Sequence, residues 1–381
     1  MNDDHPLPES DRVEGAPHPR EARTLFGQDA AEATFLDAWA AGRMHHGWLI
    51  TGARGVGKAT LAWRIARFLL STPGQGDDGL FGAPQPPATL DVPADHPVSH
   101  RISALAEPGL FLLRRVWDEK RRALKTVITV DEVRRLKSFF NLSATDGGRR
   151  VVIVDSADEM NPNAANALLK LLEEPPANAV LLLVAHQPSR LLPTIRSRCR
   201  ELRLTTLGPD DMAAAMNAAG AETSQPQALA ALSGGSVGEA IRLAQLDGLT
   251  LYAEIVALLS TLPRLDRPRA LKLADSAAGK GSETRFDLIL RLFDLFLSRL
   301  ARTGIIGPPT PEATPGEAEV LARLCPDAHA ARAWAQAAET LGSRARHGQA
   351  VNLDPASLIL DMVLRIDQTA ASLAARQAIQ V

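Results

Sequence analysis

Gly52-Ala-Arg-Gly-Val-Gly-Lys-Ala-Thr60 decides the fold of this chain. The stretch follows an apolar run, Trp48–Thr51, that predicts a buried strand. It precedes Leu61–Leu70, whose apolar residues recur at helical spacing. Between a strand and a helix, a glycine loop can turn its backbone N–H groups toward a phosphate, and the loop lysine reaches the terminal phosphates. The stretch therefore predicts an α/β domain with a phosphate-binding loop.

The position after the loop lysine departs from the usual pattern. It normally holds Ser or Thr, whose hydroxyl binds Mg²⁺. Here it is Ala59, and the hydroxyl of Thr60 lies about 100° further round the helix. The loop keeps the glycines and Lys58 that would hold phosphate, but it lacks the expected metal ligand.

A second strand pattern, Arg149–Asp155, ends in a carboxylate roughly a hundred residues after the loop. In phosphate-loop enzymes such an aspartate holds Mg²⁺, and the residue after it is usually a Glu that activates water. Here that residue is Ser156. The residues that we expect to contact a nucleotide are Gly52, Gly55, Gly57, Lys58, Thr60 and Asp155.

Apolar strand patterns alternate with helix patterns up to Leu204, which predicts a parallel sheet covered on both faces. Beyond residue 204 only helix patterns remain. The further strands are expected at Gly109–Val116, Ala179–Ala185 and Arg200–Leu204. The main helices of this part are expected at Val130–Phe140 and at Pro162–Glu174, the latter with Asn161 as its N-cap.

Composition excludes several classes of protein. The 381 residues carry a net charge of −2, which does not suit a protein that coats DNA by itself. Two cysteines cannot make a four-cysteine zinc site, and no apolar run is long enough to span a membrane. The N-terminus lacks the pattern of a signal peptide, so we expect a cytoplasmic protein without a structural disulfide.

Three further features have an ordinary interpretation. Residues 1–20 are rich in Pro, Asp, Glu and His and predict a disordered tail. His96 and His100 are separated by Pro97, which disfavours a helix and a metal site there. The basic residues of 120–137 fit a solvated surface, or a surface that contacts phosphates or another subunit, and the sequence leaves both open.

Two motifs carry a family resemblance. Asn166-Ala-Leu-Leu-Lys-Leu-Leu-Glu-Glu-Pro-Pro176 and Ser197-Arg198-Cys199 resemble those of bacterial sliding-clamp loaders, which are AAA+ ATPases of the DNA polymerase III holoenzyme. The resemblance extends over roughly Leu25–Ala244. It is weaker in the C-terminal region, where Asn352–Pro355 precedes a long helix.

The resemblance implies three domains after the tail of residues 1–20. An AAA+ nucleotide-binding-like domain with a parallel sheet is expected at 21–206 and a small helical lid at 207–247. An all-helical collar, which joins subunits into a ring, is expected at 248–381. The implied partners are the tau/gamma and delta subunits, with the sliding clamp and primed DNA reached through the complex.

The resemblance also gives Arg198 a role. In the family this arginine acts in trans as a finger on the ATP of a neighbouring subunit, and fingers of other nucleotide hydrolases contribute roughly 10³–10⁵ in rate. A permanently charged, planar guanidinium suits that task better than lysine does. On position alone, Arg198 reads as an ordinary surface residue.

Four positions depart from the pattern of the hydrolysing members. Ala59 and Ser156 replace the metal hydroxyl and the water-activating Glu. His186 stands where a small polar sensor is usual, and Gly238 where a lid arginine reads the γ-phosphate. All four changes impair one reaction, so we expect a stator-like subunit that hydrolyses ATP little or not at all. The isolated chain is then not expected to be an active enzyme, although it belongs to a polymerase complex.

The sequence leaves weak binding of ATP or ADP open, because Gly57 and Lys58 are intact. Neither a bound metal ion nor a zinc site is expected. The alternative is an ATP-hydrolysing clamp-loader motor subunit. A phosphate-loop kinase or regulator fits the two family motifs less well. A protein that binds DNA by itself fits the charge less well.

Overall fold

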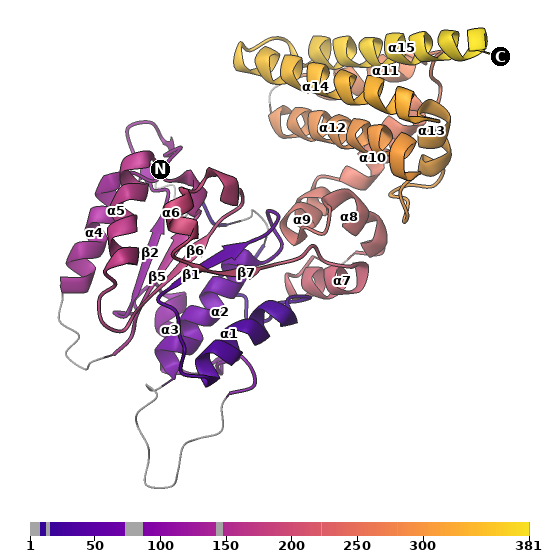
Figure 1. Cartoon of the computed structure of the whole chain (residues 1–381). Helices are drawn as coiled ribbons and strands as arrows, with labels where there is room; N and C mark the ends of the chain where they lie inside the picture. The colour runs from indigo at the N-terminus through magenta and orange to yellow at the C-terminus, as the bar shows by residue number, and fades with distance from the viewer. Residues whose placement is uncertain are drawn as a thin grey trace. The chain divides into compact units, whose positions relative to one another are not determined.

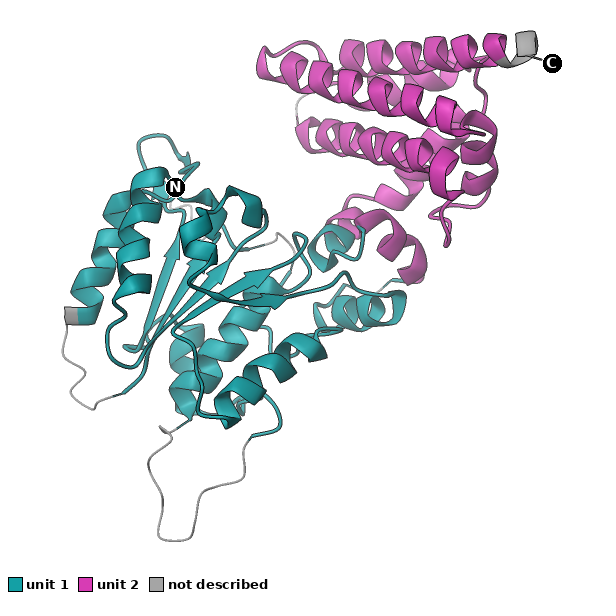
Figure 2. Cartoon of the chain, viewed as in Figure 1, with its two compact units in different colours: residues 1–223, 234–241 teal, residues 224–233, 242–381 magenta. Residues whose placement is uncertain are grey.

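The computed structural model of the chain describes residues 8–12, 16–72, 87–141, 148–221, 223–279 and 281–380. The chain forms two compact units, shown in different colours in Figure 2. Unit 1 comprises residues up to 223 together with 234–241, and unit 2 comprises 224–233 and the chain from residue 242 onward. The three domain boundaries expected from the family stay a prediction.

A five-stranded parallel sheet forms the centre of unit 1, in the order β2-β5-β6-β1-β7. The α/β class with a parallel sheet is therefore confirmed. β5 and β6 are apolar along most of their length and buried, as expected for strands covered on both faces. The strands are β1 (Gly47–Thr51), β2 (Leu110–Arg114), β5 (Arg150–Asp155), β6 (Ala179–Val184) and β7 (Arg200–Arg203).

Helices cover both faces of this sheet (Figure 1). On one face, Val152 and Val154 of β5 pack with Leu136 of α4 and Leu168 of α5 in a buried apolar core. The opposite face is covered by α2, most of whose residues are buried. The helices of unit 1 are α1 (Asp29–Ala40), α2 (Lys58–Ser71), α3 (Pro97–Ser103), α4 (Val130–Asn141), α5 (Pro162–Glu173), α6 (Pro193–Arg196) and α7 (Pro209–Ala218), with the first residues of α9 (Val237–Gln245), whose last four belong to unit 2.

Two local features differ from expectation. Pro97 begins α3 rather than interrupting a helix, because the first helical position needs no N–H donor. The ring of His96 caps this helix by accepting a hydrogen bond from the Val98 N–H at 3.2 Å. The basic segment after β2 contains a small hairpin of β3 (Trp117–Asp118) and β4 (Ala123–Leu124).

The structure also differs from the disordered tail expected at residues 1–20. Residues 8–12 and 16–20 pack against the domain, and the side chain of His18 is only 1% exposed. Its ring meets the ring of Trp63 in α2 edge-on, at 6.1 Å between centroids. Contacts between charged side chains, rather than an apolar pattern, hold these residues. Residues 1–7 and 13–15 lie outside the described residues.

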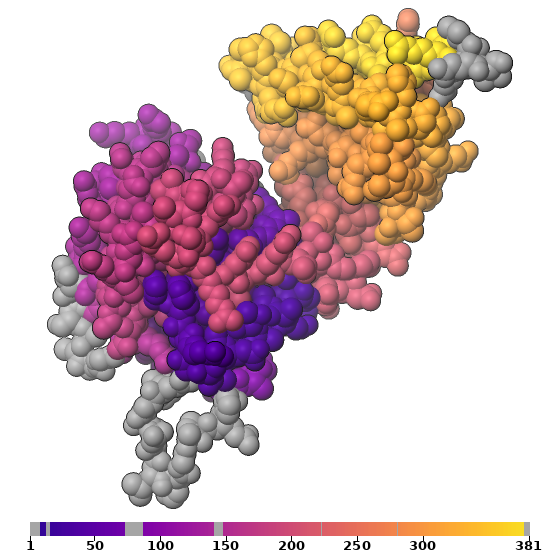
Figure 3. All heavy atoms as spheres, in the orientation of Figure 1, coloured from indigo at the N-terminus to yellow at the C-terminus, as the bar shows by residue number. Residues whose placement is uncertain are grey.

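The described residues of unit 2 form helices and connecting loops, without a strand. The long helix α12 presents Phe293, Phe296 and Leu300 to a buried core and packs along α14. Helices α14 and α15 form an outer surface of the unit (Figure 3). The helices are α8 (Pro226–Ser233), α10 (Gly248–Leu259), α11 (Arg267–Asp275), α12 (Glu283–Ile306), α13 (Glu317–Leu324), α14 (Ala328–Ala350) and α15 (Pro355–Gln380). In the part of the chain that the structure describes, no helix is both long and apolar enough to cross a membrane.

Candidate functional site

The phosphate loop connects the carboxyl end of β1 to the first turn of α2, as predicted. Gly52, Gly55 and Gly57 have φ angles of +141°, +80° and +98°, which favour glycine. Each glycine is also closely approached by other parts of the chain. A Cβ on Gly52 would lie 2.7 Å from the backbone oxygen of Leu204, and one on Gly57 would lie 2.5 Å from the side chain of Leu25. Both the backbone conformation and the close packing therefore require these glycines.

Lys58 lies at the start of α2 with a side chain that is almost fully buried. Its ammonium group donates hydrogen bonds to the loop's own carbonyls, those of Gly52 at 2.8 Å and of Ala53. Burial lowers the pKa of Lys58 to about 8, and the charges of Asp155 and Asp158 oppose that shift. The loop lysine thus keeps a position from which it could meet a phosphate.

Asp155 ends β5 and lies beside Arg114, the last residue of β2, in the parallel register. Its carboxylate accepts a hydrogen bond from the Ser156 hydroxyl at 3.2 Å. Burial is the main cause that raises the pKa of Asp155, to about 7, and the nearby charge of Asp11 adds to it. A carboxylate that is partly protonated at neutral pH is a weaker ligand for Mg²⁺ than an ionised one.

His186 follows the carboxyl end of β6 and lies near Lys58. The backbone N–H groups of His186 and Gln187 each donate to the carboxylate of Asp158 at 3.0 Å. Burial, followed by the charge of Lys58, lowers the pKa of His186 to about 4. The imidazole is therefore neutral at physiological pH, and it occupies the position where we expected a sensor residue.

Val237 and Gly238, which fall in the expected lid, lie against the phosphate loop within unit 1. The N–H of Val237, the first residue of α9, donates to the carbonyl of Gly55 at 2.9 Å. The N–H of Gly238 would lie 3.3 Å from a Cβ on Gly55. Gly238 therefore lies next to the loop, and this position carries no side chain that could read a phosphate. Thr60 lies half-buried in the first turn of α2.

Arg198 lies at the amino ends of the strands, whereas the phosphate loop lies at their carboxyl ends. It precedes β7, which runs parallel to β1 with Arg200 paired to Trp48. Its backbone oxygen would be 3.2 Å from a Cβ on Gly47, the first residue of β1, whereas the loop follows the last residue of that strand. Five residues of strand span about 16 Å. The fold does not bring Arg198 to its own loop.

The guanidinium of Arg198 is held at the surface. It pairs with the carboxylate of Glu173 at 3.0 Å and donates to the carbonyl of Thr194 at 3.0 Å. Its side chain is 37% exposed, so it remains accessible to another molecule. Cys199, by contrast, is partly buried. Burial raises the pKa of its thiol to about 12, which is consistent with a packing role.

Gln28 connects two loops of unit 1, a role that its sequence context did not predict. Its buried side chain accepts from the Thr205 N–H at 3.0 Å and donates to the Thr205 carbonyl at 2.8 Å. It also lies 3.4 Å from the carbonyl of Val56 in the phosphate loop. The amide ties the loop to the chain that leaves β7. No periodicity could reveal a pair so distant in sequence.

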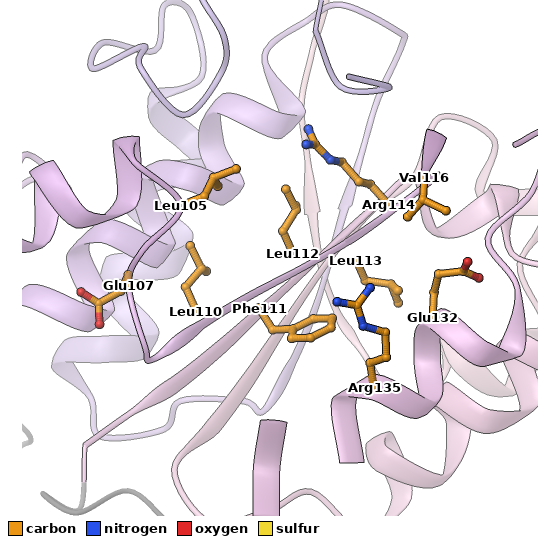
Figure 4. A pocket seen from close by; sticks show the side chains of 10 residues that line it. All are labelled: Leu105, Glu107, Leu110, Phe111, Leu112, Leu113, Arg114, Val116, Glu132 and Arg135. Carbon is orange, nitrogen blue, oxygen red and sulfur yellow. The ribbon is translucent and has the colours of Figure 1, made fainter. Parts of the chain in front are cut away.

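A pocket of about 220 Å³ lies along the edge strand β2 and does not include the phosphate loop (Figure 4). Leu112 and Arg114 of β2 point to one side of the strand, and Phe111 points to the other. Alternation along a strand produces this arrangement. By register, Arg114 and Asp155 share the face that α2 covers.

The sequence model of the family described as "DNA polymerase III, delta subunit" matches residues 27–208. Residues 27–208 are therefore similar to the DNA polymerase III delta-subunit family. This region contains the phosphate loop, Asp155 and Arg198.

Individual delta-prime proteins agree with the family assignment. DNA polymerase III subunit delta' of Pseudomonas aeruginosa is 42% identical over 154 residues, which cover 40% of this chain and 41% of that protein. The delta' subunit of Escherichia coli is 35% identical over 212 residues, which cover 55% and 58% of the two chains. The chain thus spans about half the length of these delta-prime relatives. A DNA polymerase III gamma subunit-related protein from Thermotoga maritima matches 88% of this chain and 99% of its own at 17% identity and a TM-score of 0.38.

Proposed function

We propose that this chain is a delta-prime-like stator subunit of the sliding-clamp loader of DNA polymerase III. In this proposal it supplies Arg198 to ATP bound by a neighbouring subunit and hydrolyses ATP little or not at all itself. The observation that carries the proposal is the position of Arg198. Arg198 lies at the opposite end of the strands from its own phosphate loop, and its guanidinium is accessible.

The chemistry of the chain's own loop supports the second part of the proposal. Ala59 offers no hydroxyl to a metal ion, and Ser156 offers no carboxylate to activate water. His186 is neutral at physiological pH because its pKa is about 4, and Gly238 has no side chain beside the loop. A site with these residues lacks the groups that hydrolysis needs. Weak binding of ATP or ADP through the loop backbone and Lys58 remains part of the proposal, as does the absence of zinc.

The partners follow from the family. In the proposal the helices of residues 248–381 form the collar that joins this chain to the tau/gamma and delta subunits. The sliding clamp and primed DNA are then reached through the complex. The competing candidate, a motor subunit that hydrolyses ATP, is favoured by one observation only, the intact geometry of the loop glycines and Lys58.

The test compares ATP turnover by the isolated chain with turnover by reconstituted loaders that contain wild-type, Arg198→Ala or Arg196→Ala chains. Arg196 is the matched control, since it is an exposed arginine two residues away. The proposal expects no turnover by the isolated chain. It also expects a several-fold loss of clamp- and DNA-stimulated turnover with Arg198→Ala, normal turnover with Arg196→Ala, and assembly of all three loaders. Turnover by the isolated chain would support the motor candidate instead.

A further inference from the structure

Two acidic residues near the N-terminus are bound at the end of the sheet where the phosphate loop lies. The guanidinium of Arg114 pairs with the carboxylate of Glu9 at 2.7 Å and with that of Asp11. The side chain of Asp11 is fully buried. Because Arg114 ends β2, these contacts bring residues 8–12, here called the N-terminal strap, to the carboxyl edge of the sheet.

Further contacts fix the strap to the helix that follows the phosphate loop. The His18 ring accepts a hydrogen bond from the Arg20 N–H at Nδ1, at 3.0 Å, so its proton lies on Nε2. That nitrogen faces Asp11 at 3.2 Å and Glu9 at 3.6 Å, and the ring packs edge-on against Trp63 of α2. The strap is therefore part of the packed structure of unit 1.

The strap changes the charge around the candidate nucleotide site. Arg114 lies beside Asp155 in register and on the same face of the sheet, and it is the cation that ends the edge strand. Its guanidinium forms ion pairs with both strap carboxylates. Asp11 is also close enough to Asp155 to raise the pKa of that carboxylate, which places the strap within the electrostatic field of the site. A polyphosphate would meet added negative charge there and would find this arginine already paired.

We propose that Glu9 and Asp11 form an acidic strap that hinders, in cis, the binding of nucleoside triphosphates at the phosphate loop. The inference rests on one part of the proposed function, the weak affinity of this loop for nucleotide, and it does not involve Arg198. Since the effects of strap and nucleotide are reciprocal, nucleotide that does bind should loosen the strap.

The test measures binding of a fluorescent ATP analogue, with and without Mg²⁺, to the full chain. The strap variant is the double substitution Glu9→Gln and Asp11→Asn, which removes both charges while keeping the size of the side chains. Glu21→Gln is the matched control, because Glu21 is acidic, exposed and close in sequence. We expect at least tenfold tighter binding by the double variant and no change with Glu21→Gln.

Adding Lys58→Ala to the double variant should abolish the gain, which would locate it at the phosphate loop. Unchanged affinity of the double variant, or a gain that survives Lys58→Ala, would overturn the proposal. If the double variant unfolds, hydrogen exchange of residues 8–12 in the wild-type chain decides: millimolar MgATP should speed it, and unchanged exchange would count against the strap. A negative result would leave the role of Arg198 intact, because the loader assay reads a different site.

Discussion

Lys58 gives the sharpest pH prediction at the scale of single residues. Its pKa falls from 10.5 to about 8 on folding, mainly because the side chain is buried. Between these two values the unfolded chain binds more protons than the folded chain, so this group makes stability rise with pH. The shift corresponds to at most about 3 kcal/mol.

The Lys58→Met chain should lack that rise. Urea unfolding of both proteins between pH 7.5 and pH 10 measures the difference, and other titrating groups cancel in the comparison. We expect the stability of wild type relative to Lys58→Met to increase across this range. If the stabilities of the two proteins changed with pH in parallel, the pKa of Lys58 would not be lowered by folding.

Glu173 gives a second prediction at the residue scale, because it pairs with Arg198 at the surface. A solvent-exposed ion pair contributes up to about 1 kcal/mol, which corresponds to roughly fivefold in rate. Glu173→Gln should therefore lower turnover of the assembled loader by less than about fivefold and leave its KM for ATP unchanged. The control is Glu174→Gln, at the exposed neighbouring residue. A loss with Glu173→Gln as large as that with Arg198→Ala would contradict a merely positioning role.

At the scale of helices, a buried ionic network connects four elements of unit 2. Glu317 at the start of α13 is fully buried and accepts from Tyr252 of α10 at 2.7 Å and from the Ala313 N–H at 2.7 Å. Arg299 of α12 binds both of its carboxylate oxygens, at 2.6 and 3.0 Å. The same guanidinium reaches the carbonyl of Ala231 in α8 at 3.3 Å, so α8 is joined to the helices of this unit.

Breaking a buried pair by removing one partner costs about 3–5 kcal/mol. Glu317→Gln and Arg299→Met should each destabilise unit 2 by an amount of this order. The double variant should lose clearly less than the sum of the two single losses, because the remaining partner no longer stays buried without its counter-charge. Chemical unfolding of the four proteins measures the coupling, and additive losses would contradict a shared network.

The elements themselves were largely predictable from sequence. Apolar runs of strand length predicted β5 and β6, and the glycine pattern predicted the turn from β1 into α2. The residues expected to bind phosphate do gather at one edge of the sheet, because the carboxyl ends of parallel strands meet there.

The contacts that the sequence did not predict join residues far apart in the chain. Gln28 binds Thr205, and Asp11 pairs with Arg114. Because the partners are so distant in sequence, neither contact produces a periodic pattern. Pro97 was misjudged because its effect depends on its position in the helix.

At the scale of the whole molecule, the proposed function assigns the phosphate loop and Arg198 to two different ATP sites. The chain keeps the loop glycines and Lys58 but has Ala59 and Ser156 at two positions expected to serve hydrolysis. It presents an accessible arginine, Arg198, at the opposite end of the strands from the loop. In the proposed function, a subunit with this arrangement contributes an arginine to a neighbour's site rather than hydrolysing ATP itself. The family match over residues 27–208 contains both features.

One measurement tests this account most directly: ATP turnover by two reconstituted clamp loaders that differ only in this chain, one with Lys58→Ala and one with Arg198→Ala. The first substitution disables the chain's own loop, and the second removes the arginine offered to a neighbour. We predict that the Lys58→Ala loader hydrolyses ATP at the wild-type rate, whereas the Arg198→Ala loader loses several-fold of its clamp- and DNA-stimulated turnover. Loss with Lys58→Ala and full activity with Arg198→Ala would contradict the account and would identify this chain as a motor subunit.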